Sequence, residues 1–270
     1  MPRERRVPLA CSIIDYQGRQ VRGTRSLGSG VFAAFDWREM VLNPGDEVIR
    51  KAKSEKGRLS DFPIEDHEKL TACLGHYSKL QSANSEDTAT WSVFGASSLH
   101  GWLPQVLAAV FDEPMLPSRW SARFWERQKH PDTGLIEHGP ESEITLIADK
   151  WCIEVEAKWR SDLDGKQGKG RQTSQVQMRA HTARQNSGPS GKNGVLIVVP
   201  SPKRFPPSRR GDSVFRRYFD VDGESYLCRP PAAEANARVI TWESLADALD
   251  GNEQMQSTAD YLRWRLNLIG

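Results

Sequence analysis

Side chains that can hold a metal ion or carry a charge recur at alternate positions in two short stretches of residues 139–159, GPESEITLIADKWCIEVEAKW. Glu154, Glu156 and Lys158 alternate with apolar residues, and Glu143 and Thr145 do the same a few residues earlier. Because successive side chains of a β-strand point to opposite faces of the sheet, this spacing predicts two strands that each carry their polar residues on one face.

A tight turn between these strands would bring the carboxylates together. If Asp149-Lys150 forms a two-residue hairpin turn, Thr145 lies opposite Glu154 and Glu143 opposite Glu156. Opposite Cβ atoms would then be roughly 4.5–5.5 Å apart, and like charges at that separation repel unless something neutralises them.

A bound cation is the simplest remedy, since carboxylates, waters and a phosphate suit Mg²⁺ or Mn²⁺. Lys158, on the same face, would then contact a scissile phosphate or the attacking water, which predicts metal-assisted phosphodiester hydrolysis. The ordinary alternative is a solvated face on which Glu154, Glu156 and Lys158 form salt bridges.

Residues 156–158, Glu-Ala-Lys, resemble the (D/E)xK half-motif of the PD-(D/E)XK, or restriction-endonuclease-like, nucleases. In that family the half-motif ends a hydrophobic strand, and an acidic residue lies about a dozen positions upstream, behind a proline-containing turn. Glu143, preceded by Pro140, meets this requirement. The family usually has aspartate there. An alternative alignment places Thr145 at that position and implies a weakened or inactive site; we favour Glu143.

The resemblance implies roles for residues on two helices. Many members carry a glutamine on the helix after this strand, where Gln175 or Gln177 stands, and a glutamate on the helix before the sheet, where Glu86 stands. The ordinary alternatives are a polar helix face for the glutamines and a helix start for Glu86. The implied catalytic residues are Glu143, Glu156, Lys158 and Gln175, and the implied Mg²⁺ (or Mn²⁺) ligands are Glu143, Glu156 and Glu86.

The same resemblance implies a nuclease that acts on DNA, by analogy in bacterial restriction or phage defence. The net charge of +2 does not by itself indicate a nucleic-acid partner. Basic residues in a glycine-rich loop at 161–174 and in a second segment at 203–217 fit the nucleic-acid partner that the resemblance implies, and the ordinary alternative is a solvated loop. We expect the nucleic-acid contacts to come from Arg160, Lys166, Lys169, Arg171 and Arg179. The alternative is a non-catalytic nucleic-acid-binding or assembly subunit that keeps the fold.

Hydrophobic periodicity along the chain predicts an α/β fold with a central mixed β-sheet flanked by helices. With the family resemblance, this becomes a restriction-endonuclease-like core at 81–270, preceded by a partly helical N-terminal extension of unknown role at 1–80. We expect strands at 10–16, 119–127, 194–199 and 238–241, and helices at 63–81, from Ser85 onward, and at 100–111, 175–184, 244–249 and 253–268.

The remaining composition bounds the setting of the protein. No apolar run approaches the length needed to cross a bilayer, and the N-terminus lacks the features of a secretory signal, so we expect a cytoplasmic protein without membrane contact. The four cysteines are widely spaced and are expected to be reduced thiols. We also expect either a homodimer or a partner subunit of a defence complex, and structural roles for His67, His76 and His100.

Overall fold

The computed structural model divides the chain into two compact units, Met1–Ala96 with Gln256–Gly270 and Ser97–Met255. The boundary expected at residues 80 and 81 therefore falls inside the first unit. The residues that the structure describes are 9–25, 30–42, 79–95, 102–113, 120–130, 133–137, 139–159, 175–201, 204, 219–222, 225–228 and 236–269.

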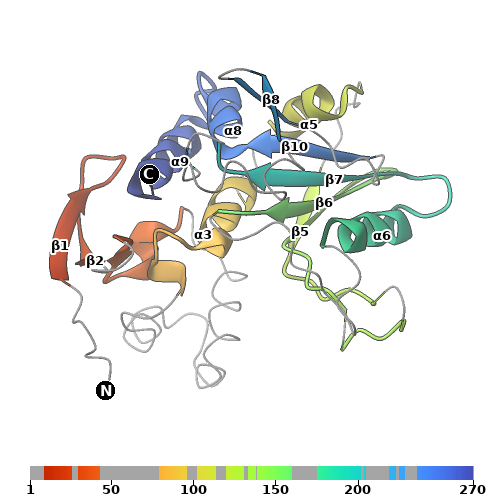
Figure 1. The fold of residues 1–270 in the computed structure, drawn as a ribbon, viewed down its shortest axis with the longest axis horizontal. Coiled ribbons are helices and arrows are strands. Elements are labelled where there is room, and N and C mark those ends of the chain that lie inside the picture. The colour runs from red at the N-terminus through yellow and green to blue at the C-terminus, as the bar shows by residue number, and fades with distance from the viewer. Residues whose placement is uncertain are drawn as a thin grey trace. The chain divides into compact units, whose positions relative to one another are not determined.

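A five-stranded mixed sheet in the order β10-β7-β6-β5-β4 is the centre of the second unit (Figure 1). Strands β4, β5 and β6 form an antiparallel meander, whereas β7 runs parallel to β6 and β10 runs parallel to β7. This arrangement confirms the expected α/β fold with a mixed sheet. The strands are Ser121–Phe124 (β4), Ile144–Ala148 (β5), Trp151–Ala157 (β6), Lys192–Val199 (β7) and Ala237–Thr241 (β10).

The hairpin between β5 and β6 has the register that the sequence predicts. Ala148 pairs with Trp151 and Thr145 with Glu154, so Asp149 and Lys150 form the two-residue turn. Asp149 has a φ of 46°, in the left-handed region that a tight hairpin turn requires. The turn and the alternation of apolar residues therefore fix which side chains share a face.

Helices cover both faces of this sheet. Helix α6 (Gln175–Ser187) connects β6 to the parallel strand β7, and its Val176 packs in one cluster with Val195 and Ile197 of β7. On the opposite face Phe111, at the end of α5 (Leu103–Phe111), lies so close to Gly194 that a Cβ there would meet the ring at 2.6 Å. The parallel part of the sheet, β6, β7 and β10, is therefore largely buried on both sides, whereas the edge strand β4 is exposed or half-buried.

A helix and a separate pair of strands are further described elements of the second unit. Helix α8 (Trp242–Leu249) follows β10 directly and is capped by the Thr241 hydroxyl, which accepts from the Ser244 N–H. Strands β8 (Phe219–Asp222) and β9 (Ser225–Cys228) form a separate antiparallel pair, which the sequence analysis did not predict.

The first unit joins an N-terminal sheet to the C-terminal helix. Strands β1 (Leu9–Ile14), β2 (Gln20–Arg25) and β3 (Phe32–Ala34) are antiparallel, and only the first of them was expected. Their core, which includes Val21 and Phe32, also receives Trp264 and Leu268 from α9. Among the described residues, the helical elements of this unit are the 3-10 helices Trp37–Met40 (η1) and Lys79–Gln81 (η3), α3 (Glu86–Thr90), the π-helix Trp91–Gly95 (η4) and α9 (Gln256–Ile269).

Some expectations concern residues that lie outside the described ranges. These are the helix at 63–81 except for its last turn, the three histidines, the loop at 161–174 and the segment at 203–217 except for Arg204. Cys11 and Cys152 are free thiols, and burial raises the pKa of Cys152 to about 12. Among the described residues, no helix has both the length and the apolar character to cross a membrane.

Candidate functional site

The polar face of β6 is buried. Glu154 and Glu156 are 0% and 1% exposed, and Lys158, just after the strand, is 5% exposed. In the parallel pairing of β6 with β7, Glu154 lies beside Val195 and Glu156 lies beside Ile197. Both of these β7 side chains belong to the hydrophobic cluster that includes Val176 of α6. The alternative of an ordinary solvated face is therefore wrong, and these charges need partners inside the protein.

Glu156 has two cationic partners. Its Oε1 lies 2.5 Å from the Nζ of Lys158, and its Oε2 lies 2.6 Å from the Nε of Arg179 on α6. Burial alone would raise the pKa of Glu156, but the charges of Arg179 and Lys158 outweigh it and hold the pKa below its ordinary value. Glu156 is therefore an ionised carboxylate in the interior.

Glu143 faces the same lysine from the preceding segment. Its Oε1 lies 3.5 Å from the Lys158 Nζ, and its Oε2 accepts a 2.6 Å hydrogen bond from the Ala157 N–H. The carboxylates of Glu143 and Glu156 therefore converge on one point, the Lys158 ammonium group. Glu143 stands one residue before β5, and its carbonyl accepts from the Trp125 N–H.

Arg179 was expected to contact nucleic acid, but the contacts that the structure shows are internal. Its side chain is 4% exposed, and its Nη2 donates a 2.7 Å hydrogen bond to the carbonyl of Glu141. Burial by itself would lower the pKa of Arg179, yet the charges of Glu156 and Glu143 raise it. Sequence reasoning missed this pairing because it depends on which face of β6 the helix covers.

Glu154 lies in a different environment from Glu156. The Thr145 hydroxyl, directly opposite on β5, donates a 2.8 Å hydrogen bond to its Oε1. Burial raises the pKa of Glu154, and the hydrogen bond from Thr145 offsets this only in part. Thr145 therefore supports a buried carboxyl group whose ionised form is disfavoured by burial. We refer below to Glu143, Glu154, Glu156, Lys158 and Arg179 as the carboxylate cluster.

The structure also describes the predicted site residues Gln175, Gln177 and Glu86. Gln175 is the first residue of α6 and is half-buried, whereas Gln177 is exposed on the same helix. Glu86 is in the first turn of α3 in the other unit, where an acidic side chain suits the helix N-terminus. The expected nucleic-acid contacts Arg160, Lys166, Lys169 and Arg171 lie outside the described residues.

The carboxylate cluster offers some of the oxygen ligands that a small divalent cation needs. Glu143 and Glu156 offer hard oxygen ligands around a point already held by a cation, and water or phosphate oxygens would have to complete the coordination. Within the described ranges, no group of three or more histidine, cysteine, aspartate or glutamate side chains is arranged to hold a metal ion. Two buried atoms of α6, Gln175 Oε1 and Arg179 Nη1, lack hydrogen-bond partners among the described residues, so the site can still accept further polar groups.

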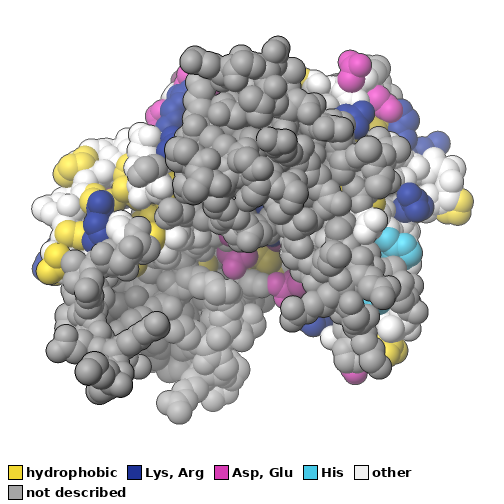
Figure 2. Space-filling model, viewed as in Figure 1, with side chains coloured by type: hydrophobic (Ala, Val, Ile, Leu, Met, Phe, Trp, Pro, Cys, Tyr) yellow, Lys and Arg dark blue, Asp and Glu magenta, His cyan; other side chains and the backbone are white. Residues whose placement is uncertain are grey.

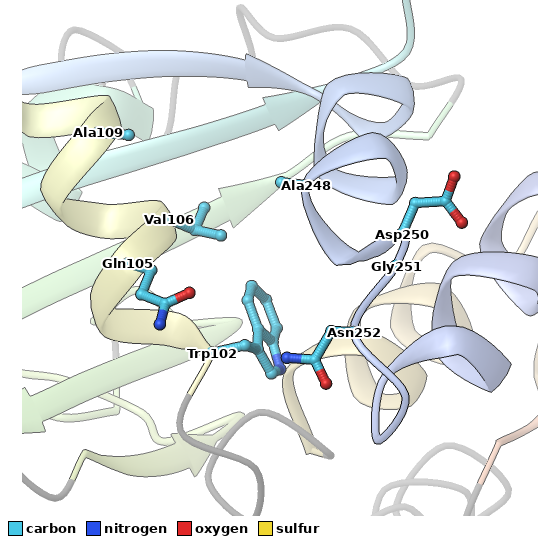
Figure 3. A pocket seen from close by; sticks show the side chains of 8 residues that line it. All are labelled: Trp102, Gln105, Val106, Ala109, Ala248, Asp250, Gly251 and Asn252. Atoms are coloured by element: carbon cyan, nitrogen blue, oxygen red, sulfur yellow. The ribbon is translucent and has the colours of Figure 1, made fainter.

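Other surface features of the described residues are separate from this cluster. Both acidic and basic side chains are visible among the described residues in Figure 2. A pocket of about 570 Å³ opens between α5 and the end of α8 (Figure 3). Its lining contains no member of the carboxylate cluster and consists of Trp102, Gln105, Val106, Ala109, Ala248, Asp250, Gly251 and Asn252.

Comparison of the chain with protein-family models, with curated proteins and with solved structures finds no match. The geometry of the carboxylate cluster and the sequence pattern that produces it are therefore the features from which a function can be inferred.

Proposed function

We propose that the protein is a metal-dependent nuclease that hydrolyses phosphodiester bonds in DNA. The observation that carries this proposal is the convergence of Glu143 and Glu156 on Lys158 at the end of β6. Two carboxylates that can hold a cation, beside a lysine that can contact a phosphate or a water, suit metal-assisted phosphodiester hydrolysis.

The order of the elements around the cluster supports the proposal. The Glu-Ala-Lys segment ends a buried strand, the second carboxylate precedes the antiparallel neighbour β5, and α6 leads from the segment into the parallel strand β7. This is the arrangement that a restriction-endonuclease-like core implies for its half-motif, its upstream acid and its next core strand.

In this proposal Glu143 and Glu156 hold the cation, and Gln175 supports the site from the first turn of α6. A bound Mg²⁺ or Mn²⁺ would supply a Lewis acid that polarises the phosphate and lowers the pKa of a coordinated water. Lys158 would leave its ion pairs to orient the attacking water or to contact the phosphate. Since α6 and β6 bury the cluster, these charges act in a region of low dielectric constant, where their influence is strong.

A specific observation also favours a second candidate, a non-catalytic nucleic-acid-binding or assembly subunit. Glu156 already has two cationic partners, Lys158 and Arg179, so its negative charge is neutralised without a metal ion. In that case the cluster would be a structural ion-pair network that has replaced a metal site.

An activity assay with matched variants tests the proposal. Purified protein is incubated with plasmid, single-stranded DNA and RNA in Mg²⁺ or Mn²⁺, beside Glu156→Ala, Lys158→Ala and the exposed control Glu137→Ala. We expect the wild type and the control to cleave DNA, and Glu156→Ala and Lys158→Ala to lose at least about a hundredfold in rate. Circular dichroism confirms that each variant is folded.

Equal inactivity of the wild type and both site variants, with nucleic-acid binding retained, would instead support the non-catalytic subunit. A defence role is tested separately in a bacterial host. There, expression of the wild type should reduce phage plating and expression of Lys158→Ala should not.

A further inference from the structure

Arg179 connects the three segments that make up the carboxylate cluster. It projects from α6, pairs through Nε with Glu156 of β6 at 2.6 Å, and donates through Nη2 to the Glu141 carbonyl at 2.7 Å. Because a guanidinium group is planar and rigid, two of its N–H groups fix the two acceptors relative to each other.

The segment that carries Glu143 depends on such contacts. Residues 141–143 precede β5, and their main chain is held by the Ser142 N–H to the Glu126 carbonyl, the Trp125 N–H to the Glu143 carbonyl, and Arg179. Glu143 itself contacts Ala157 and Lys158 from this segment. The position of the second carboxylate is therefore coupled to the first one through Arg179.

We propose that Arg179 is a positioning residue that sets the separation of the Glu143 and Glu156 carboxylates for cation binding. This inference rests on the proposed function, since it concerns the same site. The positioning role differs from neutralisation of the Glu156 charge, because it requires Arg179 to contact both the Glu156 carboxylate and the Glu141 carbonyl. A lysine would keep the positive charge but lacks the two-pronged geometry.

The two roles predict opposite effects on metal binding. If Arg179 only neutralises Glu156, it competes with an incoming cation, and Arg179→Met should bind the cation more tightly. If Arg179 positions the carboxylates, its removal lets them separate, and cation binding should weaken in spite of the lost competition. Partners that orient metal ligands typically change metal affinity by about 10–100-fold when they are removed.

The test is a Mn²⁺ titration monitored by electron paramagnetic resonance, which reports binding without any need for activity. The proteins are the full-length wild type, Arg179→Met, Arg179→Lys and Arg184→Met, the last being an exposed arginine on the same helix. We expect an increase of about tenfold in the Mn²⁺ dissociation constant for both Arg179 variants. Arg184→Met should bind as the wild type does.

Thermal unfolding decides which variants can be interpreted. If Arg179→Met does not fold, Arg179→Lys still gives the answer, because it retains a buried positive charge beside Glu156. Unchanged or tighter Mn²⁺ binding in a folded Arg179 variant overturns the positioning role while leaving the metal site intact. A wild type that does not bind Mn²⁺ overturns the proposed function itself, and the positioning role with it.

Discussion

Glu156 and Arg179 each stabilise the ionised form of the other in the protein interior. Their ion pair is buried on both sides, with side chains 1% and 4% exposed, and the pKa of each is shifted toward the charged form by the other. Removal of one partner leaves an uncompensated buried charge, which costs far more than the net stability that the pair contributes.

The variant Glu156→Gln should therefore lower the free energy of unfolding by about 3–5 kcal/mol. Urea denaturation followed by tryptophan fluorescence measures the loss. The exposed control Glu137→Gln should remain within about 0.5 kcal/mol of the wild type. Equal denaturation midpoints for Glu156→Gln and the wild type would contradict the buried ion pair.

Substitution of Glu154 should change the stability in the opposite direction to substitution of Glu156. Burial raises its pKa, so its contribution to stability is complete below the ordinary glutamate pKa and is lost as the pH rises through the raised value. At neutral pH the ionised carboxylate destabilises the folded state, and Glu154→Gln should stabilise it while keeping an acceptor for the Thr145 hydroxyl.

Urea denaturation between pH 4 and pH 8 tests this sign. The advantage of Glu154→Gln over the wild type should shrink as the pH falls toward the ordinary glutamate pKa. The Glu156 carboxylate behaves in the reverse way, because its lowered pKa makes its contribution present above the ordinary glutamate value and lost as the pH falls through the lowered one. A stability difference that does not depend on pH would contradict the assignment of Glu154.

At the scale of elements, β7 depends on the close approach of a helix. It lies between β6 and β10, and at Gly194 the ring of Phe111 occupies the space where a side chain would begin. Gly194→Ala should therefore destabilise the protein by about 1–3 kcal/mol through overpacking. The loss should be smaller in a Phe111→Leu background, and a double-mutant cycle measures that coupling. Additive effects would show that the ring is not the obstacle.

The β5–β6 hairpin could be predicted from sequence because its information is local. A two-residue turn and alternating apolar residues determine the register, so the pairing of Thr145 with Glu154 was predicted correctly. Strands β2 and β3 were missed because Gln20–Arg25 is mostly polar and Phe32–Ala34 has three residues, too few to show a period.

The partners of the carboxylates could not be predicted in the same way. Arg179 is 23 residues from Glu156 along the chain, and its contact depends on how α6 packs against the sheet. From the sequence, the repulsion between Glu143 and Glu156 indicated a metal ion. In the structure, two cationic side chains, Lys158 and Arg179, also offset the negative charge of Glu156. The metal ion is part of the proposed function.

At the scale of the whole chain, one arginine joins distant parts of the first unit. Arg265 of α9 is fully buried, and its Nη2 donates to the carbonyls of Ala83 and Ser85 at 2.9 and 3.0 Å. Its Nη1 lies 3.4 Å from the Met40 carbonyl, which also accepts from the Tyr261 hydroxyl. These contacts connect the C-terminal helix to segments at least 180 residues away.

Arg265→Met should therefore destabilise the first unit by about 2–4 kcal/mol, because each buried carbonyl that loses its donor costs about 1–3 kcal/mol. Calorimetry of the full-length protein should show that the unfolding transition of the first unit shifts to lower temperature. The unfolding transition of the second unit should be unchanged. The exposed residue Asn267 on the same helix provides a control, Asn267→Ala. A uniform shift of the whole profile would contradict the division into two units.

The discontinuity of the first unit also has a consequence during synthesis. Its N-terminal sheet packs against Trp264, Leu268 and Ile269, which the ribosome adds after all of residues 97–255. At typical elongation rates of about 5–20 residues per second, α9 is synthesised on the order of ten seconds after β2 and β3. The apolar side chains of these strands remain uncovered by α9 during that time. We therefore expect the nascent N-terminal segment to be a client of chaperones, whereas the second unit, contiguous in sequence, can fold first.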